Sequence, residues 1–143
     1  MTHHLYLGLG SNLGHREQII QSALALINQA LGKVERISSF YETEPWGFES
    51  EHKFLNIAAF VLTDLSPHEC LYKTQEIERQ LGRKQKSTDG IYHDRPIDID
   101  ILLYDHLKLS TPDLIIPHPL IKERDFVLIP LKEIYPSDSE LCL

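Results

Sequence analysis

The feature that most constrains the fold is the spacing of apolar residues, which changes repeatedly along the chain. Alternate residues are apolar in the segment 5–9, a spacing of two that is typical of a half-buried β-strand. In the segment 20–31 the apolar residues recur every three or four positions, which predicts an amphipathic helix that ends near Gly32. A chain that switches between these two periods is expected to pack helices against a sheet.

The switch then occurs a second time. Two strands are predicted at residues 34–41 and 54–63, with a loop containing Pro and Gly between them. The segment 66–69 has the form of a capping box with proline at the first helical position, so a second helix is expected from there to Gly82. A fourth main strand is predicted at residues 97–103, where the side chains that alternate toward the helices are Ile97, Ile99, Ile101 and Leu103.

The predicted order is therefore β-α-β-β-α-β, the ferredoxin-like arrangement of an α+β sandwich. In this arrangement both helices cover one face of an antiparallel sheet, and the other face is available to loops or a ligand. The last forty residues add a Pro-rich segment at 116–119 and a short apolar, helix-like run at 126–134. Because no linker or repeat interrupts the 143 residues, one domain spanning residues 1–143 is expected.

The charge of the chain argues against a polyanionic partner. The net charge is −7, whereas a nucleic-acid-binding protein normally carries a basic surface. Five basic and only two acidic residues nevertheless lie in the segment from Arg79 to Arg95, which indicates one small anionic ligand rather than a polymer. The alternative is an ordinary solvated loop with scattered charges. No apolar run is long enough to cross a membrane, and two cysteines are too few for a disulfide framework or a Cys-rich zinc site. A soluble cytoplasmic protein is expected.

An acidic pair in the fourth strand is the first candidate for chemistry. Asp98 and Asp100 are two residues apart, so their side chains share one sheet face with Cα atoms about 6.5–7 Å apart. Two adjacent carboxylates repel each other unless a cation lies between them, and oxygen ligands favour Mg²⁺ or Ca²⁺. Nearby Arg83 and Arg95 present planar forks that bind phosphate, so the four residues together predict a phosphoryl-binding site. The alternative is solvated aspartates and surface ion pairs.

Other residues suggest a flat ligand rather than a dinucleotide fold. The glycines at 8, 10 and 14 are spaced one residue too far apart for G-x-G-x-x-G, so we interpret them as a tight strand-to-helix turn. Asn56 is the one strongly polar residue in an apolar strand. Its amide either forms hydrogen bonds to a flat heterocycle, on which Phe54 would stack, or bonds to neighbouring backbone. His118 stands between two prolines, and Trp46 lies on a Pro-Gly loop as a lid residue or a hydrophobic plug.

Several short motifs occur together in one order along the chain. They are Gly10-Ser11-Asn12-Leu13, Ser38-Ser39-Phe40-Tyr41 with Thr43, Phe54-Leu55-Asn56, Gln75 and Glu78 with Gly82-Arg83, Arg95-Pro96-Ile97-Asp98-Ile99-Asp100, Pro117-His118 and Arg124-Asp125-Phe126. In this order the chain resembles the 6-hydroxymethyl-7,8-dihydropterin pyrophosphokinases of the folate pathway over residues 5 to 135. The resemblance implies transfer of pyrophosphate from ATP to the hydroxymethyl oxygen of the pterin, with release of AMP.

The resemblance also implies a role for each matching residue. Two Mg²⁺ ions would be held by Asp98 and Asp100, and charge on the transferring group would be neutralised by Arg83 and Arg95. The residues expected to bind ATP are Gln75, Glu78, Lys86, Ile101, His118 and Arg124. The residues expected to bind the pterin are Thr43, Glu44, Trp46, Phe54, Asn56, Tyr92 and Phe126. A monomer that binds these small molecules, and neither nucleic acid nor membrane, is expected.

Departures from the family pattern fall in two places. Gln85, between Lys84 and Lys86, stands where the family commonly has a second arginine, and His93-Asp94 replaces Gly-Pro. Asp113 stands where a basic residue is common. The polar segment 84–94 is expected to act as a lid that orders when both substrates are bound.

Three other functions compete with this interpretation. A ferredoxin-like module that binds a metabolite without catalysis accounts for the fold, but it leaves the aspartate pair beside Arg95 unexplained. A metal-dependent phosphohydrolase would release inorganic phosphate without a pterin. RNA binding on the open sheet face lacks the aromatic and basic strand motif.

Overall fold

The computed structural model describes residues 1–44, 53–82 and 96–135. In chain order its elements are β1 (His3–Ser11), α1 (Arg16–Ala30), β2 (Gly32–Ile37), β3 (Tyr41–Thr43), β4 (Phe54–Thr63), α2 (Pro67–Gln80), β5 (Asp98–Tyr104), β6 (Leu109–Ser110), β7 (Ile115–Ile116), a 3₁₀ turn (Ile121–Glu123) and α3 (Asp125–Ile134). In this part of the chain no helix combines the length and the apolar composition that a membrane span requires.

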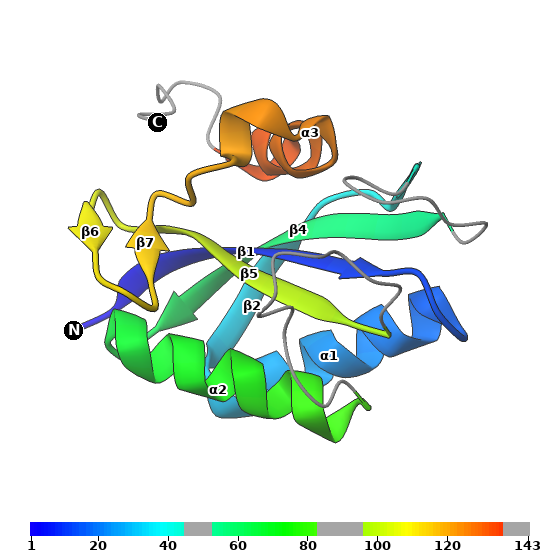
Figure 1. Cartoon of the computed structure of the whole chain (residues 1–143). Coiled ribbons are helices and arrows are strands. Elements are labelled where there is room, and N and C mark those ends of the chain that lie inside the picture. The colour runs from blue at the N-terminus through cyan, green and yellow to red at the C-terminus, as the bar shows by residue number, and fades with distance from the viewer. Residues whose placement is uncertain (45–52, 83–95, 136–143) are drawn as a thin grey trace.

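The main sheet has the order β2-β4-β1-β5, with β3 also paired to β4, and all of its pairings are antiparallel. The first and third main strands are therefore central, as in a ferredoxin-like fold, so that predicted arrangement is confirmed. Helices α1 and α2 lie together on one face of this sheet (Figure 1). The order of strands matters for function because it places the last strand, β5, directly beside β1.

The face that α1 and α2 cover holds the larger apolar core. The alternating leucines of β1 are buried there against Ile20 and Ile27 of α1 and Ile77 of α2. The predicted capping box starts α2, because Glu69 N–H donates to Ser66 Oγ at 3.3 Å and Ser66 N–H donates to Glu69 Oε1 at 2.9 Å. Helix α2 thus begins where its capping box predicts, and both helices face the sheet as their apolar patterns predict.

The helix-like run predicted at residues 126–134 forms α3, which covers part of the opposite sheet face (Figure 1). Its Val127, Leu131 and Ile134 pack in a second core with Tyr6 and Phe60 of the sheet. The fold therefore has two helical layers, with the sheet between them. This second core does not reach the whole face.

The predicted strand at residues 34–41 is wrong in one respect, because it is interrupted. Ile37 pairs with Ala59 and Tyr41 pairs with Asn56, so three residues, 38–40, lie opposite two residues of β4. At the interruption Ser38 N–H donates to Ala58 O, and Ala58 N–H donates to the Ser38 hydroxyl, each at 2.9 Å. The serine side chain thus replaces a backbone partner, and two short strands, β2 and β3, result.

The expected orientation of Leu103 is also wrong. In the pairing of β1 with β5, Tyr6 lies opposite Leu103 and Leu7 lies opposite Ile101, which leaves Leu102 as an extra residue. Such a bulge breaks the alternation of a strand. Leu102 and Leu103 therefore both pack in the core beneath α3, whereas Ile99 and Ile101 face α1 and α2 as predicted.

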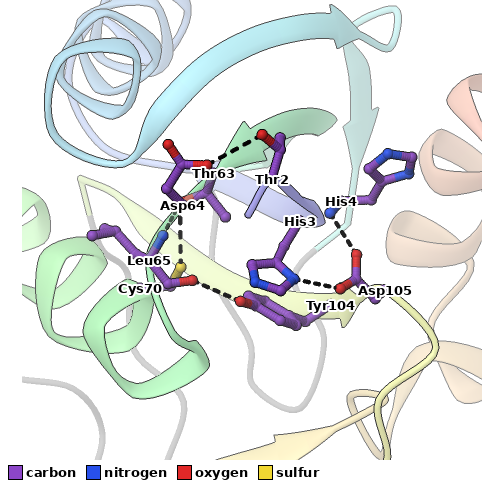
Figure 2. Close-up of polar contacts among 9 residues, drawn as sticks. All are labelled: Thr2, His3, His4, Thr63, Asp64, Leu65, Cys70, Tyr104 and Asp105. Atoms are coloured by element: carbon purple, nitrogen blue, oxygen red, sulfur yellow. Dashed lines mark hydrogen bonds and ion pairs between the residues drawn. The ribbon is translucent and has the colours of Figure 1, made fainter.

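One end of the sheet is closed by polar contacts between the start of β1 and the end of β5 (Figure 2). Asp105 Oδ1 accepts a hydrogen bond of 2.7 Å from His4 N–H, and its Oδ2 lies 2.6 Å from His3 Nδ1. Next to them Tyr104 donates its hydroxyl hydrogen to Leu65 O at 2.7 Å. The predicted chemical residues of β5 lie at the other end of the sheet, where β5 pairs with Gly8–Gly10.

Candidate active site

Two aspartates of β5 and two glycines of β1 line the same hollow. Asp100 pairs with Gly8 and Asp98 pairs with Gly10 across the two strands, and all four residues line this first hollow. Because glycine has no side chain, the space beside the carboxylates stays open. The first hollow is lined by Gly8, Leu9, Gly10, Thr43, Glu44, Phe54, Asn56, Ile57, Asp98, Asp100, Arg124, Phe126 and Val127.

The interpretation of Gly8 and Gly10 as part of a turn is therefore wrong, since both lie inside β1. Only Gly14, with φ of 71°, belongs to the connection to α1. At Gly10 a Cβ atom would lie 2.7 Å from Asn56 Oδ1, closer than packed atoms approach, whereas at Gly8 the nearest atom would be 3.5 Å away. A side chain at position 10 would thus displace Asn56.

Asn56 faces into the first hollow and is 5% exposed. Its Nδ2 donates to Thr43 Oγ1 at 2.6 Å, so the amide is oriented by a side chain of β3. The alternative that Asn56 only bonds to neighbouring backbone is not what the structure has. Strand β3 pairs with β4 so that Thr43 lies opposite Phe54 and Tyr41 opposite Asn56. The short strand β3 thus forms one wall of the first hollow.

Another part of the wall comes from the start of α3. Phe126 and Val127 line the first hollow together with Arg124, which is 7% exposed and has its guanidinium carbon 5.6 Å from the centre of the Phe126 ring. Two aromatic rings, an amide and three carboxylates therefore surround one space. Of the residues predicted to bind pterin, Thr43, Glu44, Phe54, Asn56 and Phe126 are brought together here.

Arg16, at the start of α1, holds the two strand ends beside this hollow. Its guanidinium donates to Glu42 Oε2 and to the Lys53 carbonyl, both at 2.8 Å. The hydrogen bond from Arg16 keeps the pKa of Glu42 below its usual value. This contact was not anticipated from the sequence, because it joins α1 to the ends of β3 and β4.

A second hollow, of about 250 Å³, also has Asp100 in its lining. It is lined by Leu71, Gln75, Ile99, Asp100, Ile101, Pro112, Asp113, Leu114, Ile115, His118 and Pro119. The predicted ATP-binding residues Gln75, Ile101 and His118 thus share this hollow, whereas Arg124 lines the first one. Asp100 is the residue that lines both hollows, so the two spaces are neighbours at this position of β5.

His118 is oriented by the backbone around it. Its own N–H donates to Leu102 O at 3.0 Å, and its Nδ1 accepts from Leu120 N–H at 3.2 Å. A neutral His118 ring therefore carries its proton on Nε2. The arrangement leaves Nε2 as the ring donor.

Glu78 does not line either hollow. It is 2% exposed and lies between α2 and β5, where its Oε2 accepts a hydrogen bond of 2.7 Å from Ile99 N–H. Direct contact between Glu78 and ATP stays a prediction. The observed contact holds the backbone between the two aspartates.

Asp113, at the rim of the second hollow, is paired with residues of the protein. Its Oδ1 accepts from the Thr111 hydroxyl at 2.9 Å and lies 3.0 Å from His68 Nε2. These contacts, the Thr111 hydrogen bond foremost, hold the pKa of Asp113 below its usual value. The pairing with His68 ties the rim to α2, a link that the sequence pattern did not indicate.

The fit of a metal ion depends on the two aspartates of β5. No group of three or more His, Cys, Asp or Glu side chains within residues 1–44, 53–82 and 96–135 is arranged to hold a metal. Two carboxylates on one open hollow nevertheless suit Mg²⁺, which normally completes its coordination with phosphate oxygens and water. The residues present thus fit a magnesium ion that arrives with a phosphate ligand.

Five predicted site residues lie outside the described residues: Trp46, Arg83, Lys86, Tyr92 and Arg95. The predicted lid at residues 84–94 lies outside them as well.

Comparison with known proteins gives one consistent result. The family model described as 7,8-dihydro-6-hydroxymethylpterin-pyrophosphokinase (HPPK) matches residues 6–136. The 2-amino-4-hydroxy-6-hydroxymethyldihydropteridine pyrophosphokinase of Porphyromonas gingivalis is 51% identical over 133 residues, which cover 92% of this chain and 90% of the relative. The Bacillus subtilis protein of the same name is 45% identical over 135 residues, or 94% of this chain and 79% of that protein.

Solved structures share the fold. The chain matches the wild-type HPPK-DHPS of Plasmodium falciparum, solved with pteroate, with a TM-score of 0.79 and 17% identity over 100% of its length. It spans 40% of that longer chain. With a family model and relatives that cover nearly its whole length, the chain belongs to the 7,8-dihydro-6-hydroxymethylpterin-pyrophosphokinase family.

Proposed function

We infer that the protein transfers pyrophosphate from ATP to 6-hydroxymethyl-7,8-dihydropterin and releases AMP, a step of folate biosynthesis. Family membership supports this reaction, and the observation that carries it in the structure is the position of Asp100. A transfer between two substrates needs two spaces that meet at one point. Asp100 is shared by the linings of the first and second hollows, which supports this arrangement.

The first hollow is proposed to bind the pterin. A flat heterocycle with ring N–H and carbonyl groups would stack between Phe54 and Phe126 and exchange hydrogen bonds with the amide of Asn56. Thr43 supports this because it already holds Nδ2 of Asn56 at 2.6 Å and so fixes the amide plane. The remaining proposed pterin contacts are Glu44, Trp46 and Tyr92.

The second hollow is proposed to bind ATP, through Gln75, Ile101 and His118. Its opening toward Asp100 would direct the phosphates to the boundary between the hollows. Asp98 and Asp100 would hold Mg²⁺, which we propose to be two ions. When bound, magnesium neutralises phosphate charge and lowers the pKa of a coordinated hydroxyl, so no side-chain base is required.

The protein itself contributes positioning and positive charge. Arg83 and Arg95 are proposed to neutralise charge on the transferring group, with Lys86 and Arg124 as further cationic contacts to ATP. Glu78 is proposed to act behind the strand, by holding Ile99 N–H. Exclusion of water by the segment 84–94 would limit hydrolysis of ATP, because water competes with the pterin hydroxyl.

We also propose that the protein acts as a monomer in the cytoplasm. The cytoplasm is proposed because the reaction consumes ATP and a reduced pterin.

The test is incubation of the purified protein with ATP, Mg²⁺ and reduced 6-hydroxymethylpterin, followed by identification of the products. We expect one AMP for each diphosphorylated pterin. Release of inorganic phosphate without a modified pterin would indicate a phosphohydrolase. Pterin binding without any AMP would favour a metabolite-binding module and would overturn the proposed reaction.

A further inference from the structure

Glu133 joins the two walls of the first hollow without lining it. This residue lies in the last turn of α3, and its carboxylate accepts hydrogen bonds from the segment that leads into β3. Its Oε2 accepts from Ser39 N–H at 2.8 Å and from the Ser39 hydroxyl at 3.0 Å, and its Oε1 accepts from the Tyr41 hydroxyl. Three donors therefore converge on one side chain from a segment 92 to 94 residues away in sequence.

The two elements joined in this way each carry part of the wall of the first hollow. Helix α3 supplies Phe126 and Val127 from its first turn, and β3 supplies Thr43. Tyr41 lies directly opposite Asn56 in the pairing of β3 with β4. A shift of β3 relative to α3 would therefore change both the width of the hollow and the support of the Asn56 amide by Thr43.

The apolar contacts of α3 do not fix this spacing on their own. Val127, Leu131 and Ile134 pack against the sheet, and such packing is favourable over a range of small displacements because the hydrophobic effect has no direction. Hydrogen bonds do have a preferred direction and length, and those to a carboxylate are stronger than neutral ones. The contacts of Glu133 are thus suited to set where α3 lies along β3.

We propose that Glu133 is a positioning residue for the acceptor substrate, which sets the distance between α3 and β3 and so the shape of the first hollow. This proposal rests on the proposed function, since it takes the first hollow as the pterin site. Glu133 is not among the residues that line either hollow, so it acts through Tyr41 and Ser39 on one side and through α3 on the other.

The electrostatics of the contact agree with this geometry. The Tyr41 hydrogen bond keeps the pKa of Glu133 below its usual value, and the same bond raises the pKa of Tyr41. At neutral pH Glu133 is therefore an anion and Tyr41 a neutral donor, which is the combination that the three hydrogen bonds require. Glu133 is also exposed, so its removal leaves no buried cavity and the fold is expected to persist.

The test compares four variants with the wild type: Glu133→Ala, Glu133→Gln, Tyr41→Phe and Lys132→Ala. Lys132 is the control because it is the exposed neighbour on the same helix. For each protein one measures KM for the pterin, KM for ATP, kcat and Tm, and titrates the pterin directly in the presence of a non-hydrolysable ATP analogue.

We expect Glu133→Ala to raise the pterin KM and dissociation constant by about 5- to 20-fold, with the ATP KM changed less than about twofold. Tyr41→Phe should give an intermediate rise, because it removes one of the three hydrogen bonds. Glu133→Gln should restore most of the pterin affinity, since its oxygen still accepts from Ser39 and its amide can donate to the Tyr41 oxygen. Lys132→Ala should match the wild type.

Equal pterin affinity in Glu133→Ala and Lys132→Ala would overturn the proposal. So would parallel loss of pterin and ATP affinity with a lowered Tm, because that pattern indicates a general structural role. These results differ from failure of the proposed function, which would appear as a wild-type protein that makes no AMP. A wild type that turns over normally beside an unaffected Glu133→Ala refutes only the role of Glu133.

Discussion

The buried carboxylate of Glu78 accepts a hydrogen bond from the backbone of Ile99, with Oε2 2.7 Å from the nitrogen. Ile99 is the residue between Asp98 and Asp100, so a side chain of α2 holds the part of β5 that carries both candidate metal ligands. β5 is an edge strand of the main sheet, where it pairs with β1 on one side. Helix α2 therefore supplies a bond that a further strand would otherwise supply.

Replacing Glu78 with alanine is expected to lower both stability and turnover. The Ile99 N–H would lose its buried partner, at a cost of about 1–3 kcal/mol in the free energy of unfolding. The aspartates would also lose their fixed backbone, which should reduce kcat more than the pterin KM. Urea unfolding and steady-state kinetics measure these effects, with exposed Glu76→Ala on the same helix as the control. Normal kinetics in a destabilised Glu78→Ala protein would show that the contact serves only the fold.

Asp98→Asn and Asp100→Asn should each reduce Mg²⁺-dependent turnover by about 100-fold or more. Both changes keep the side-chain volume and remove a charge that a cation and phosphates need. Thermal stability should stay the same or rise slightly, because the repulsion between two neighbouring carboxylates is relieved. Turnover and Tm are measured together, with exposed Asp64→Asn as the control. Near-normal rates at saturating Mg²⁺ in both variants would refute the metal assignment.

Gly10→Ala should destabilise the protein, whereas Gly8→Ala should not. At position 10 the new methyl group would lie 2.7 Å from Asn56 Oδ1, while at position 8 its nearest neighbour is Leu102 at 3.5 Å. The overlap at position 10 is expected to cost about 1–3 kcal/mol. Urea unfolding of the two variants measures the difference. Equal stability of both would mean that Asn56 moves aside without loss.

His68→Ala and Asp113→Asn should raise the KM for ATP with a smaller effect on kcat. Both residues fix the rim of the second hollow, where the rim residue Asp113 lies 3.0 Å from His68 Nε2. Lys73→Ala, on the exposed side of α2, which also carries His68, should leave the ATP KM unchanged.

The lowered pKa of Asp113 also predicts a pH dependence. Its contribution to stability is present above the unfolded pKa of an aspartate and is lost as the pH falls through the lower folded value. Asp113→Asn should therefore have a lower free energy of unfolding at neutral pH, and this free energy should fall less than that of the wild type as the pH is lowered.

Cys70 should be unreactive in the folded protein. Burial raises the pKa of its thiol to about 11, and the sulfur lies 4.0 Å from the Thr63 hydroxyl (Figure 2). Because the thiol pKa is higher in the folded protein, the neutral Cys70 contributes fully to folding stability below the unfolded pKa of a cysteine. This contribution is lost as the pH rises toward 11. In a Cys142→Ser background, a thiol reagent at pH 8 should label Cys70 only after unfolding. Rapid labelling of the native protein would contradict this burial.

The sequence predicted those parts of the fold that depend on local patterns. The capping box at Ser66 and the apolar faces of α1 and α2 are set by residues close together in the chain, so they could be recognised directly. The breaks at Ser38 and Leu102 could not, because each depends on how a strand lies against its neighbour. Gly8 and Gly10 were misplaced for the same reason, since their use is apparent only when Asp100 and Asp98 lie opposite them.

The residues of the candidate site also fall into those that the sequence could indicate and those that it could not. Asp98, Asp100 and Asn56 were found because a charged or amide side chain in an apolar strand is conspicuous. The roles of Glu78, Arg16 and Glu133 depend on contacts between elements far apart in sequence, and an acidic or basic residue on a helix gives no sign of such a contact. A signal did exist for the hollow itself, namely a Gly-x-Gly strand and an Asp-x-Asp strand in one chain.

The extra residue at Leu102 makes β5 tolerant of a change in length at one point only. Loss of Ile99 would make the two aspartates adjacent in the strand and turn one of their side chains toward the core beneath α1 and α2, because successive side chains of a strand lie on opposite faces. Loss of Leu102 would leave every other side chain of β5 on its present face. It would, however, remove the carbonyl that His118 N–H uses, at 3.0 Å. The extra residue Leu102, which the sheet itself does not need, thus holds the backbone of His118. A homologue without this residue would have to position its histidine in another way.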